Sequence, residues 1–459
     1  MKDLLLKAYH MLPHSVKEFA LQGIVKKRHL WRYGDSLPTL VEEAAERETW
    51  SFDQWKIYQE NKLEKVLHNA YHKVPYYKKQ WSERRQKGDT SNYNNIDNWP
   101  ILTKDELRNN NAQFLAEDKN PKKMYQEHTS GTSGKPLNVY WSKETTQFYY
   151  SLVERRIRNW HGININDKYL MIGGQLVVPY NQKKPPYWVR VKSINQMYLS
   201  SYHISIDTIK HYAEAINKFQ PKYMFGYASS MYSLAYFIKQ TGIKIQPLTA
   251  AISNAEPLLN YQKELIEEVF NCTMINTYGM SELVAAGCTY KTDEMVLFPE
   301  VGIINTYDFN EDKILTGQAG RFICTGIINK DMPLIKYELG DSGTLGRSTI
   351  DKLDYISITS IEGRTDDMVI TKDGRRIGRL DPVFKKDLNI VEAQIIQETL
   401  DDFVLKIVPD KNYTDADGIN IINSLKQRIG ETNITIDLVN HIERTNTGKF
   451  KAVVSKIEQ

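Results

Sequence analysis

A ten-residue stretch, His128 to Leu137, has the composition of an anion-binding loop. It reads His-Thr-Ser-Gly-Thr-Ser-Gly-Lys-Pro-Leu, with two glycines, four hydroxyl side chains and one lysine. Small residues let backbone N–H groups close on an anion, and hydroxyls and an ammonium add donors, which is chemistry suited to phosphates. It is not a Walker loop, because two residues rather than four separate Gly131 from Gly134-Lys135. Taken alone, such a stretch is more often an ordinary loop.

Five further segments carry side chains suited to a nucleotide. Ser253–Pro257 forms a turn that can present backbone carbonyls to a flat ring, and Thr277–Glu282 offers an aromatic face, a glycine, a hydroxyl and a carboxylate. Tyr337–Asp341 ends in a carboxylate that can accept both ribose hydroxyls, and Gly363–Asp367 contains a guanidinium. Thr445–Lys449 places a lysine near the C-terminus. Each segment alone is explained by packing or solvation, so a function depends on their combination.

The elements between these segments predict an α/β sheet with helices on its faces. From about residue 125, short apolar runs alternate with helical patterns. Strands are expected in Tyr169–Val178 (strand, turn, strand), Tyr223–Gly226, Thr249–Ile252 and Thr273–Asn276, and helices in Met231–Lys239 and Tyr261–Phe270. Ligands of such sheets gather at loops that leave the carboxyl ends of strands. The polar clusters Tyr227–Ser230, Ser253–Pro257 and Thr277–Glu282 all follow such strands.

The two ends of the chain have different patterns. Residues 1–100 form a mostly helical lead-in, and one helix with an apolar face over Leu63–Tyr71 is expected to end at Val74-Pro75. Beyond residue 360, a small α+β unit is expected. Its strands are Val391–Glu398, Phe403–Val408 and Ile434–Val439, and its helix is Ala416–Ile429. We predict a large domain over residues 1–364 and a small mobile domain over residues 365–459.

Composition narrows the class of protein. The chain has 459 residues, 41% of them hydrophobic and 25% charged, which is typical of a globular protein with two or more domains. A net charge of +4 over this length does not indicate nucleic-acid binding. There is no apolar run long enough for a transmembrane helix and no signal-peptide core. Cys272, Cys288 and Cys324 match no metal spacing, so reduced thiols in a cytoplasmic protein are expected.

The basic run Val25–His29 raises the alternative of a peripheral membrane contact. A membrane-surface helix needs a sustained apolar face. Leu4, Leu5, Ala8, Met11 and Leu12 supply only a short one. The sequence therefore favours a solvated basic face over membrane binding.

The order and spacing of all six segments resemble the adenylate-forming superfamily of acyl- and aryl-CoA synthetases. The phosphate loop is most similar to that of the phenylacetate–CoA ligase group. Arg32-Tyr33-Gly34 and Ala70-Tyr71…Val74-Pro75-Tyr76-Tyr77 resemble the CapK-like branch, which acts in capsular polysaccharide biosynthesis. The resemblance runs from His128 to Lys451, and at the N-terminal end extends to nearly the whole chain. It implies a large N-terminal adenylation domain with mixed sheets and helices, and a small C-terminal lid.

The resemblance also implies how ATP and Mg²⁺ are held. The loop over the β- and γ-phosphates is Thr129, Ser130, Gly131, Thr132, Ser133, Gly134 and Lys135. Ala255, Glu256 and Pro257 would line the adenine slot, Tyr278 would stack on the adenine, and Gly279 would also bind the nucleotide. Thr277 or Ser281 would touch the α-phosphate, and Asp341 the ribose with Arg364 nearby. Glu282 would hold Mg²⁺, Asp366 would be the hinge, and Lys449 would reach the reacting carboxylate. The residues implied in catalysis are Lys449, Glu282, Thr132 and Arg364.

The sequence indicates the acid substrate and the acyl acceptor only by chemical class. A pocket built from Tyr227, Ser229, Ser230 and the turn at Gly174 would be partly polar, which favours a small aromatic, hydroxylated or amino acid over a fatty acid. Tyr149, Tyr150, Arg155 and Arg156 either contribute to it or only pack. One extra residue precedes Gly374 after the hinge, so the acceptor stays open between CoA, an amine, a hydroxyl and a carrier protein.

Three functions are compatible with these features. The leading hypothesis is an ATP-dependent, AMP-forming carboxylate ligase that makes an acyl-adenylate for cell-envelope polysaccharide synthesis. The first alternative is an aryl-CoA ligase of the phenylacetate–CoA ligase type. The second is an inactive relative that acts as a scaffold, and the joint presence of Glu282, Asp341, Arg364 and Lys449 argues against it.

Overall fold

The computed structural model describes most of the chain. The described residues are 9, 11–129, 137–348, 350, 353–364, 369–372, 376–377, 380, 383, 388–444 and 450–457, with no side-chain description at 128, 129, 362–364 and 376. The chain forms two compact units, each assembled from distant segments. Unit 1 comprises Met1–Val25, Asn166–Asn276 and Glu362–Gln459, and unit 2 comprises Lys26–Ile165 and Thr277–Ile361.

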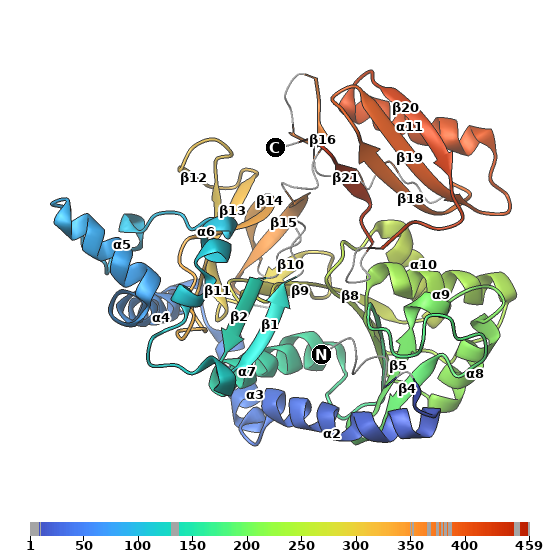
Figure 1. Ribbon diagram of the computed structural model, residues 1–459, viewed down its shortest axis with the longest axis horizontal. Coiled ribbons are helices and arrows are strands. Elements are labelled where there is room, and N and C mark those ends of the chain that lie inside the picture. Colours follow the sequence, from blue (N-terminus) through green and yellow to red (C-terminus); the bar gives the residue numbers. More distant parts are fainter. Residues whose placement is uncertain are drawn as a thin grey trace. The chain divides into compact units, whose positions relative to one another are not determined.

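Unit 1 contains a mostly parallel sheet. Its strands are β3 (Tyr169–Gly173), β4 (Trp188–Val191), β5 (Gln196–Ser200), β6 (Tyr223–Gly226), β7 (Ala250–Ser253) and the start of β8 (Thr273–Gly279), in the order β8-β7-β6-β3-β5-β4. Only β4, at the edge, runs antiparallel to its neighbour. Strand β7 is buried throughout, as expected for a parallel strand covered on both faces. Helices α8 (Ile209–Phe219), α9 (Ala228–Thr241) and α10 (Asn260–Phe270) pack against this sheet (Figure 1). The predicted α/β fold is confirmed.

Two elements differ from the prediction. The second strand expected before Val178 is not formed. Val177 and Val178 instead pack with Val189 of β4. Helix α9 begins at Ala228, before the predicted start at Met231, and this puts Ser229 in its first turn. Its N-cap residue makes no side-chain capping bond, and the carboxylate of Glu256 accepts from Ser229 N at 3.0 Å instead. The cap is therefore supplied from another loop, which local sequence patterns cannot reveal.

The C-terminal part of unit 1 has the predicted α+β pattern. A four-stranded sheet has the order β20-β19-β18-β21. Its elements are β18 (Ile390–Gln397), β19 (Asp402–Pro409), α11 (Asp415–Ile429), β20 (Asn433–Leu438) and β21 (Val453–Ser455). Helix α11 covers one face of the sheet (Figure 1). Ile421 and Leu425 of this helix pack with Ile395 and Leu405. The division of the chain at residue 364 stays a prediction.

Unit 2 joins the helical lead-in to an antiparallel sheet. The helices are α3 (Leu37–Glu46), α4 (Phe52–Lys73), α5 (Pro75–Gln86), α6 (Lys104–Asn109) and α7 (Lys143–Leu152), and a hairpin consists of β1 (Tyr125–Thr129) and β2 (Leu137–Trp141). The sheet order is β12-β11-β13-β14-β15-β10-β9, followed by the end of β8. Its strands are β9 (Ala286–Thr289), β10 (Met295–Leu297), β11 (Gly302–Tyr307), β12 (Ile314–Leu315), β13 (Gly320–Gly326), β14 (Tyr337–Ser348) and β15 (Tyr355–Arg364). Helix α4 ends before Val74-Pro75, as predicted.

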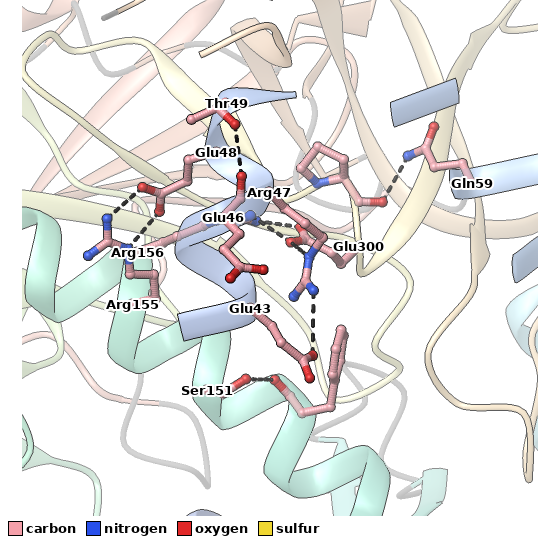
Figure 2. A network of polar contacts seen from close by, with 12 residues as sticks. Glu43, Glu46, Arg47, Glu48, Thr49, Gln59, Ser151, Arg155, Arg156 and Glu300 are labelled. Carbon is pink, nitrogen blue, oxygen red and sulfur yellow. Dashed lines mark hydrogen bonds and ion pairs between the residues drawn. The ribbon is translucent and has the colours of Figure 1, made fainter. Parts of the chain in front are cut away.

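A buried ion network ties the lead-in to the sheet of unit 2 (Figure 2). Arg156 makes two hydrogen bonds to Glu300, of 2.5 and 2.6 Å, and Arg47 Nε lies 3.1 Å from the same carboxylate. Arg156 and Glu300 are both 0% exposed. Arg155 makes two hydrogen bonds to Glu48, of 2.9 and 2.6 Å. The two arginines considered for the acyl pocket thus serve structural ion pairs.

Candidate functional site

The end of β8 and the middle of β14 bring together two residues that the resemblance assigns to the nucleoside. Tyr278 pairs with Gly287 of β9, and its hydroxyl donates to Asp341 Oδ2 at 2.8 Å. Gly340, just before Asp341, has a φ of +80°, which favours glycine. The proposed base-stacking ring therefore also orients the proposed ribose carboxylate. These residues lie 63 positions apart in the sequence, so only the tertiary fold makes this contact.

The Tyr278–Asp341 contact predicts a kinetic effect. Tyr278→Phe keeps the ring for stacking and removes the hydroxyl that holds Asp341. We expect the KM for ATP to rise about tenfold with little change in kcat, because a hydrogen bond to a charged group contributes about 1.5–3 kcal/mol. Steady-state kinetics at varied ATP measures this, with Tyr180→Phe, 72% exposed, as the matched control. An unchanged KM for Tyr278→Phe would contradict the role.

Glu282 is held in a buried position beside the same strands. Tyr337 OH donates to its Oε1 at 3.3 Å, and Glu282 is only 7% exposed. The next residue, Leu283, has a φ of +53°, a costly conformation that persists where its surroundings impose it. Trp141 Nε1 donates to the carbonyl of Ser281 at 3.0 Å and fixes the preceding turn. The Glu282 carboxylate is thus oriented by Tyr337, and carboxylate oxygens are the ligands that a hard cation takes.

Glu256 links three segments of unit 1. It follows Ala255, whose φ of +63° is left-handed, and it is 9% exposed. Its Oε2 accepts from Ser229 N at 3.0 Å, and its Oε1 accepts from Phe450 N at 2.6 Å. Burial raises the pKa of this carboxyl. The side chain thus ties the turn to α9 and to the C-terminal part, and the backbone of the turn is the part left to line an adenine slot.

One further contact attaches the C-terminal part of unit 1 to α9, and an ion pair lies within that part. Tyr236 OH, on α9, donates to Asp410 Oδ2 at 2.5 Å. Arg444 pairs with Glu392 at 2.7 Å, and burial raises the pKa of the Glu392 carboxyl. Phe450, which Glu256 binds, follows Lys449 directly in the chain. The described neighbour of the predicted catalytic lysine is therefore attached to the predicted adenine turn.

The residues predicted for the acyl pocket lie near a turn that tyrosines contact. A Cβ on Gly173 would lie 3.3 Å from the Tyr198 hydroxyl and 3.8 Å from the Tyr227 ring. Tyr202 OH donates to Gly174 O at 3.0 Å. Burial raises the pKa of Tyr227, so its phenol is neutral and can donate a hydrogen bond. Ser229 and Ser230 are buried in the first turn of α9.

Several residues that contact the predicted site residues are not indicated by the sequence. These are Tyr198, Tyr202, Tyr337 and Phe450. With 28 tyrosines in the chain, nothing local distinguishes the few whose hydroxyls reach the site. Tyr337 begins the segment that carries Asp341, and Phe450 is next to Lys449. For Tyr337 and Phe450, the signal in the sequence is their closeness to a predicted site residue.

Part of the predicted site lies outside the described residues. Ser130, Gly131, Thr132, Ser133, Gly134, Lys135, Asp366 and Lys449 fall there. Thr129 and Arg364 are described only as the last residues of β1 and β15. Thr129 pairs with Leu137, so the phosphate-loop residues connect the two strands of a hairpin. The roles of all these residues stay predictions.

Sequence comparisons relate this chain to two groups of proteins. Residues 369–456 match the CapK C-terminal domain family. Protein CapK of Staphylococcus aureus is 28% identical over 377 residues, covering 79% of this chain and 81% of that protein. The phenylacetate-coenzyme A ligase of Pseudomonas putida is 24% identical over 338 residues, 71% of this chain and 74% of the ligase.

A solved structure shares the fold. It is the 2-hydroxyisobutyryl-CoA ligase in the postadenylation state with R3-HIB-AMP, which superposes with a TM-score of 0.70 at 17% identity. The superposition covers 89% of this chain and 91% of the ligase. The chain is thus a homologue of CapK and of the phenylacetate–CoA ligases, with a CapK C-terminal domain and the fold of adenylate-forming ligases.

Proposed function

We propose that this protein is an ATP-dependent, AMP-forming ligase that adenylates a small carboxylic acid and transfers the acyl group to an acceptor in capsular or cell-envelope polysaccharide synthesis. The observation that carries the proposal is the hydrogen bond from Phe450 N to Glu256. It attaches the chain next to Lys449 to the turn assigned to adenine. The relation to CapK supports the pathway, and the relation to phenylacetate–CoA ligases supports the chemistry.

The residues suit the adenylation step. A carboxylate oxygen of the acid attacks the α-phosphorus of ATP, a new P–O bond forms, and pyrophosphate leaves. Like charges repel in this approach, and the ammonium of Lys449 together with donors of the loop at 129–135 would offset the repulsion most in the transition state. Asp341 would hold the ribose while Tyr278 stacks on the base.

Mg²⁺ fits the donor set. Within the described residues there is no cluster of three or more His, Cys, Asp or Glu that could hold a metal. Mg²⁺ is usually bound through one or two carboxylates together with substrate phosphates, and Glu282 is a carboxylate positioned for that use. Bound there, the ion would neutralise charge on the phosphates.

The acid and the acceptor are proposed by class. The neutral phenols near Gly173 and Gly174 favour a short acid with aromatic or hydrogen-bonding groups over a fatty acid. The acceptor is CoA, an amine, a hydroxyl or a carrier protein. We propose a cytoplasmic location, since the reaction consumes ATP and the three cysteines are free thiols.

Acid-dependent ATP–pyrophosphate exchange tests the proposal. A panel of aromatic, hydroxylated, amino and long-chain acids is screened, and active acids are then offered with CoA or with amines. Exchange with a short polar acid supports the proposed reaction, and thioester formation with an aryl acid alone would favour a catabolic aryl-CoA ligase. Absence of exchange with every acid would contradict the proposal and favour the scaffold hypothesis.

Glu256 allows a sharper test. Glu256→Gln offers one acceptor oxygen to two N–H donors, so one of its two hydrogen bonds must be lost. We expect pyrophosphate exchange to fall about tenfold, in line with the loss of a charged hydrogen bond. ATP affinity should stay close to wild type, because the backbone of the turn is unchanged. Equal losses in exchange rate and ATP affinity would show that the side chain binds the nucleotide directly.

A further inference from the structure

Helix α2 (His14–Tyr33) uses one face to cover the edge of the unit 1 sheet. Glu18 Oε1 accepts from Arg190 N of β4 at 2.8 Å, and Gln22 Nε2 donates to Arg190 O at 3.2 Å. Ser193 N, just after β4, donates to Gln22 Oε1 at 3.0 Å. Side chains of α2 thus occupy backbone groups that an uncovered edge strand would expose. This face of the helix is committed to the fold.

Several large apolar side chains are exposed on α2, and Met11 is exposed shortly before the helix begins. Met11 is 86% exposed, Phe19 80% and Ile24 69%, and Val16 and Leu30 are also exposed. Of the sixteen large apolar side chains exposed among the described residues, five lie between residues 11 and 30. Single exposed apolar residues are common, but a group of them on one helix indicates an interaction site.

The charged residues of α2 indicate what kind of surface this helix could bind. Lys26, Lys27 and Arg28 are consecutive and exposed on the same helix. The only acidic residue of α2 is Glu18, which is bound to Arg190 N and lies 3.2 Å from His14. The outer surface of the helix therefore combines apolar side chains with three cations and no acidic side chain.

We propose that the outer face of α2 binds the surface of an anionic lipid bilayer. Phe19 and Ile24 would enter the boundary between headgroups and acyl chains, and Lys26, Lys27 and Arg28 would contact lipid phosphates. The contact is peripheral, because no helix within the described part of the chain is long and apolar enough to cross a membrane. Sequence alone favoured a solvated face, but it could not show that these apolar side chains point away from the fold. The proposal does not depend on the ligase activity.

Vesicle flotation of the full chain tests this proposal. We expect binding to vesicles of phosphatidylcholine mixed with phosphatidylglycerol, weaker binding at high salt, and little binding to phosphatidylcholine alone. Phe19→Ser should lower the partition coefficient about tenfold through loss of buried apolar surface. Lys26→Gln with Lys27→Gln should lower it about 25-fold, or fivefold per cation.

Matched variants separate a local effect from a general one. Ile419→Ser removes an apolar side chain that is 54% exposed on α11, and Lys122→Gln with Lys123→Gln removes two exposed cations elsewhere. Both should leave flotation unchanged, and circular dichroism should show that all variants fold. Absence of binding to anionic vesicles would overturn the proposal. So would equal losses in the control variants, or a self-association in sedimentation velocity that Phe19→Ser abolishes without any effect on flotation.

Discussion

Replacing Lys449 with alanine is expected to lower acid-dependent pyrophosphate exchange by about a hundred- to a thousandfold, the range seen when one preorganised transition-state donor is removed. ATP binding should persist, because the proposed ammonium acts on charge that develops as the carboxylate attacks. Exchange kinetics measures the first quantity and equilibrium titration with ATP the second. The attachment of Phe450 to Glu256 makes this lysine the most informative single position.

Lys426 supplies a control in the same part of the chain. It lies on α11, pairs with Glu431 at 2.7 Å and is not among the residues assigned to ATP. Lys426→Ala should therefore exchange pyrophosphate at the wild-type rate. Normal exchange by Lys449→Ala would remove this residue from the mechanism. Loss of both exchange and ATP binding would point to a role in nucleotide binding instead.

Glu300→Ala should give the largest loss of stability. It would leave the guanidinium groups of Arg156 and Arg47 without their shared carboxylate in a buried site (Figure 2). Removing one partner of a buried pair typically costs about 3–5 kcal/mol, because an uncompensated charge remains. Chemical denaturation followed by circular dichroism should show an early transition of the affected region.

An exposed ion pair provides the comparison. Glu268 lies 2.6 Å from Lys239, and both side chains are about half exposed. Glu268→Ala should change the free energy of unfolding by less than about 1 kcal/mol, because solvent screens such pairs. If the two variants unfolded at the same denaturant concentration, the buried network would stabilise the fold no more than an exposed ion pair does.

Elements governed by local sequence were predicted closely. Strand β6 has its predicted bounds, Tyr223–Gly226, and α4 ends where Val74-Pro75 requires. These features follow from apolar patterns and from the restriction that proline places on the preceding residue. The start of α9 was missed by three residues because its cap comes from Glu256, a distant side chain. Local patterns carry no information on such a partner.

In the candidate site, too, the sequence predicts the residues but not the contacts between distant ones. Sequence order identified Tyr278, Glu282 and Asp341 as a set, through resemblance to a family with ordered motifs. It could not show that Tyr278 binds Asp341 or that Tyr337 binds Glu282, since these contacts depend on strand register. The ordered motifs indicate which side chains are present for the reaction. The contacts that orient those side chains arise only when distant strands pair.

Helix α2 shows most clearly what the sequence determines and what the tertiary structure determines. The sequence by itself determined its apolar and basic residues, just as it determined the Gly/Ser/Thr-rich loop and the strand pattern of the sheet. Only the tertiary structure decided which of its faces is buried, because Glu18 and Gln22 bind the edge strand β4 and turn Phe19 and Ile24 outward. A helix with apolar residues on more than one side can bury any of them. The element that the helix packs against, here strand β4, determines which side stays exposed to solvent or to a membrane.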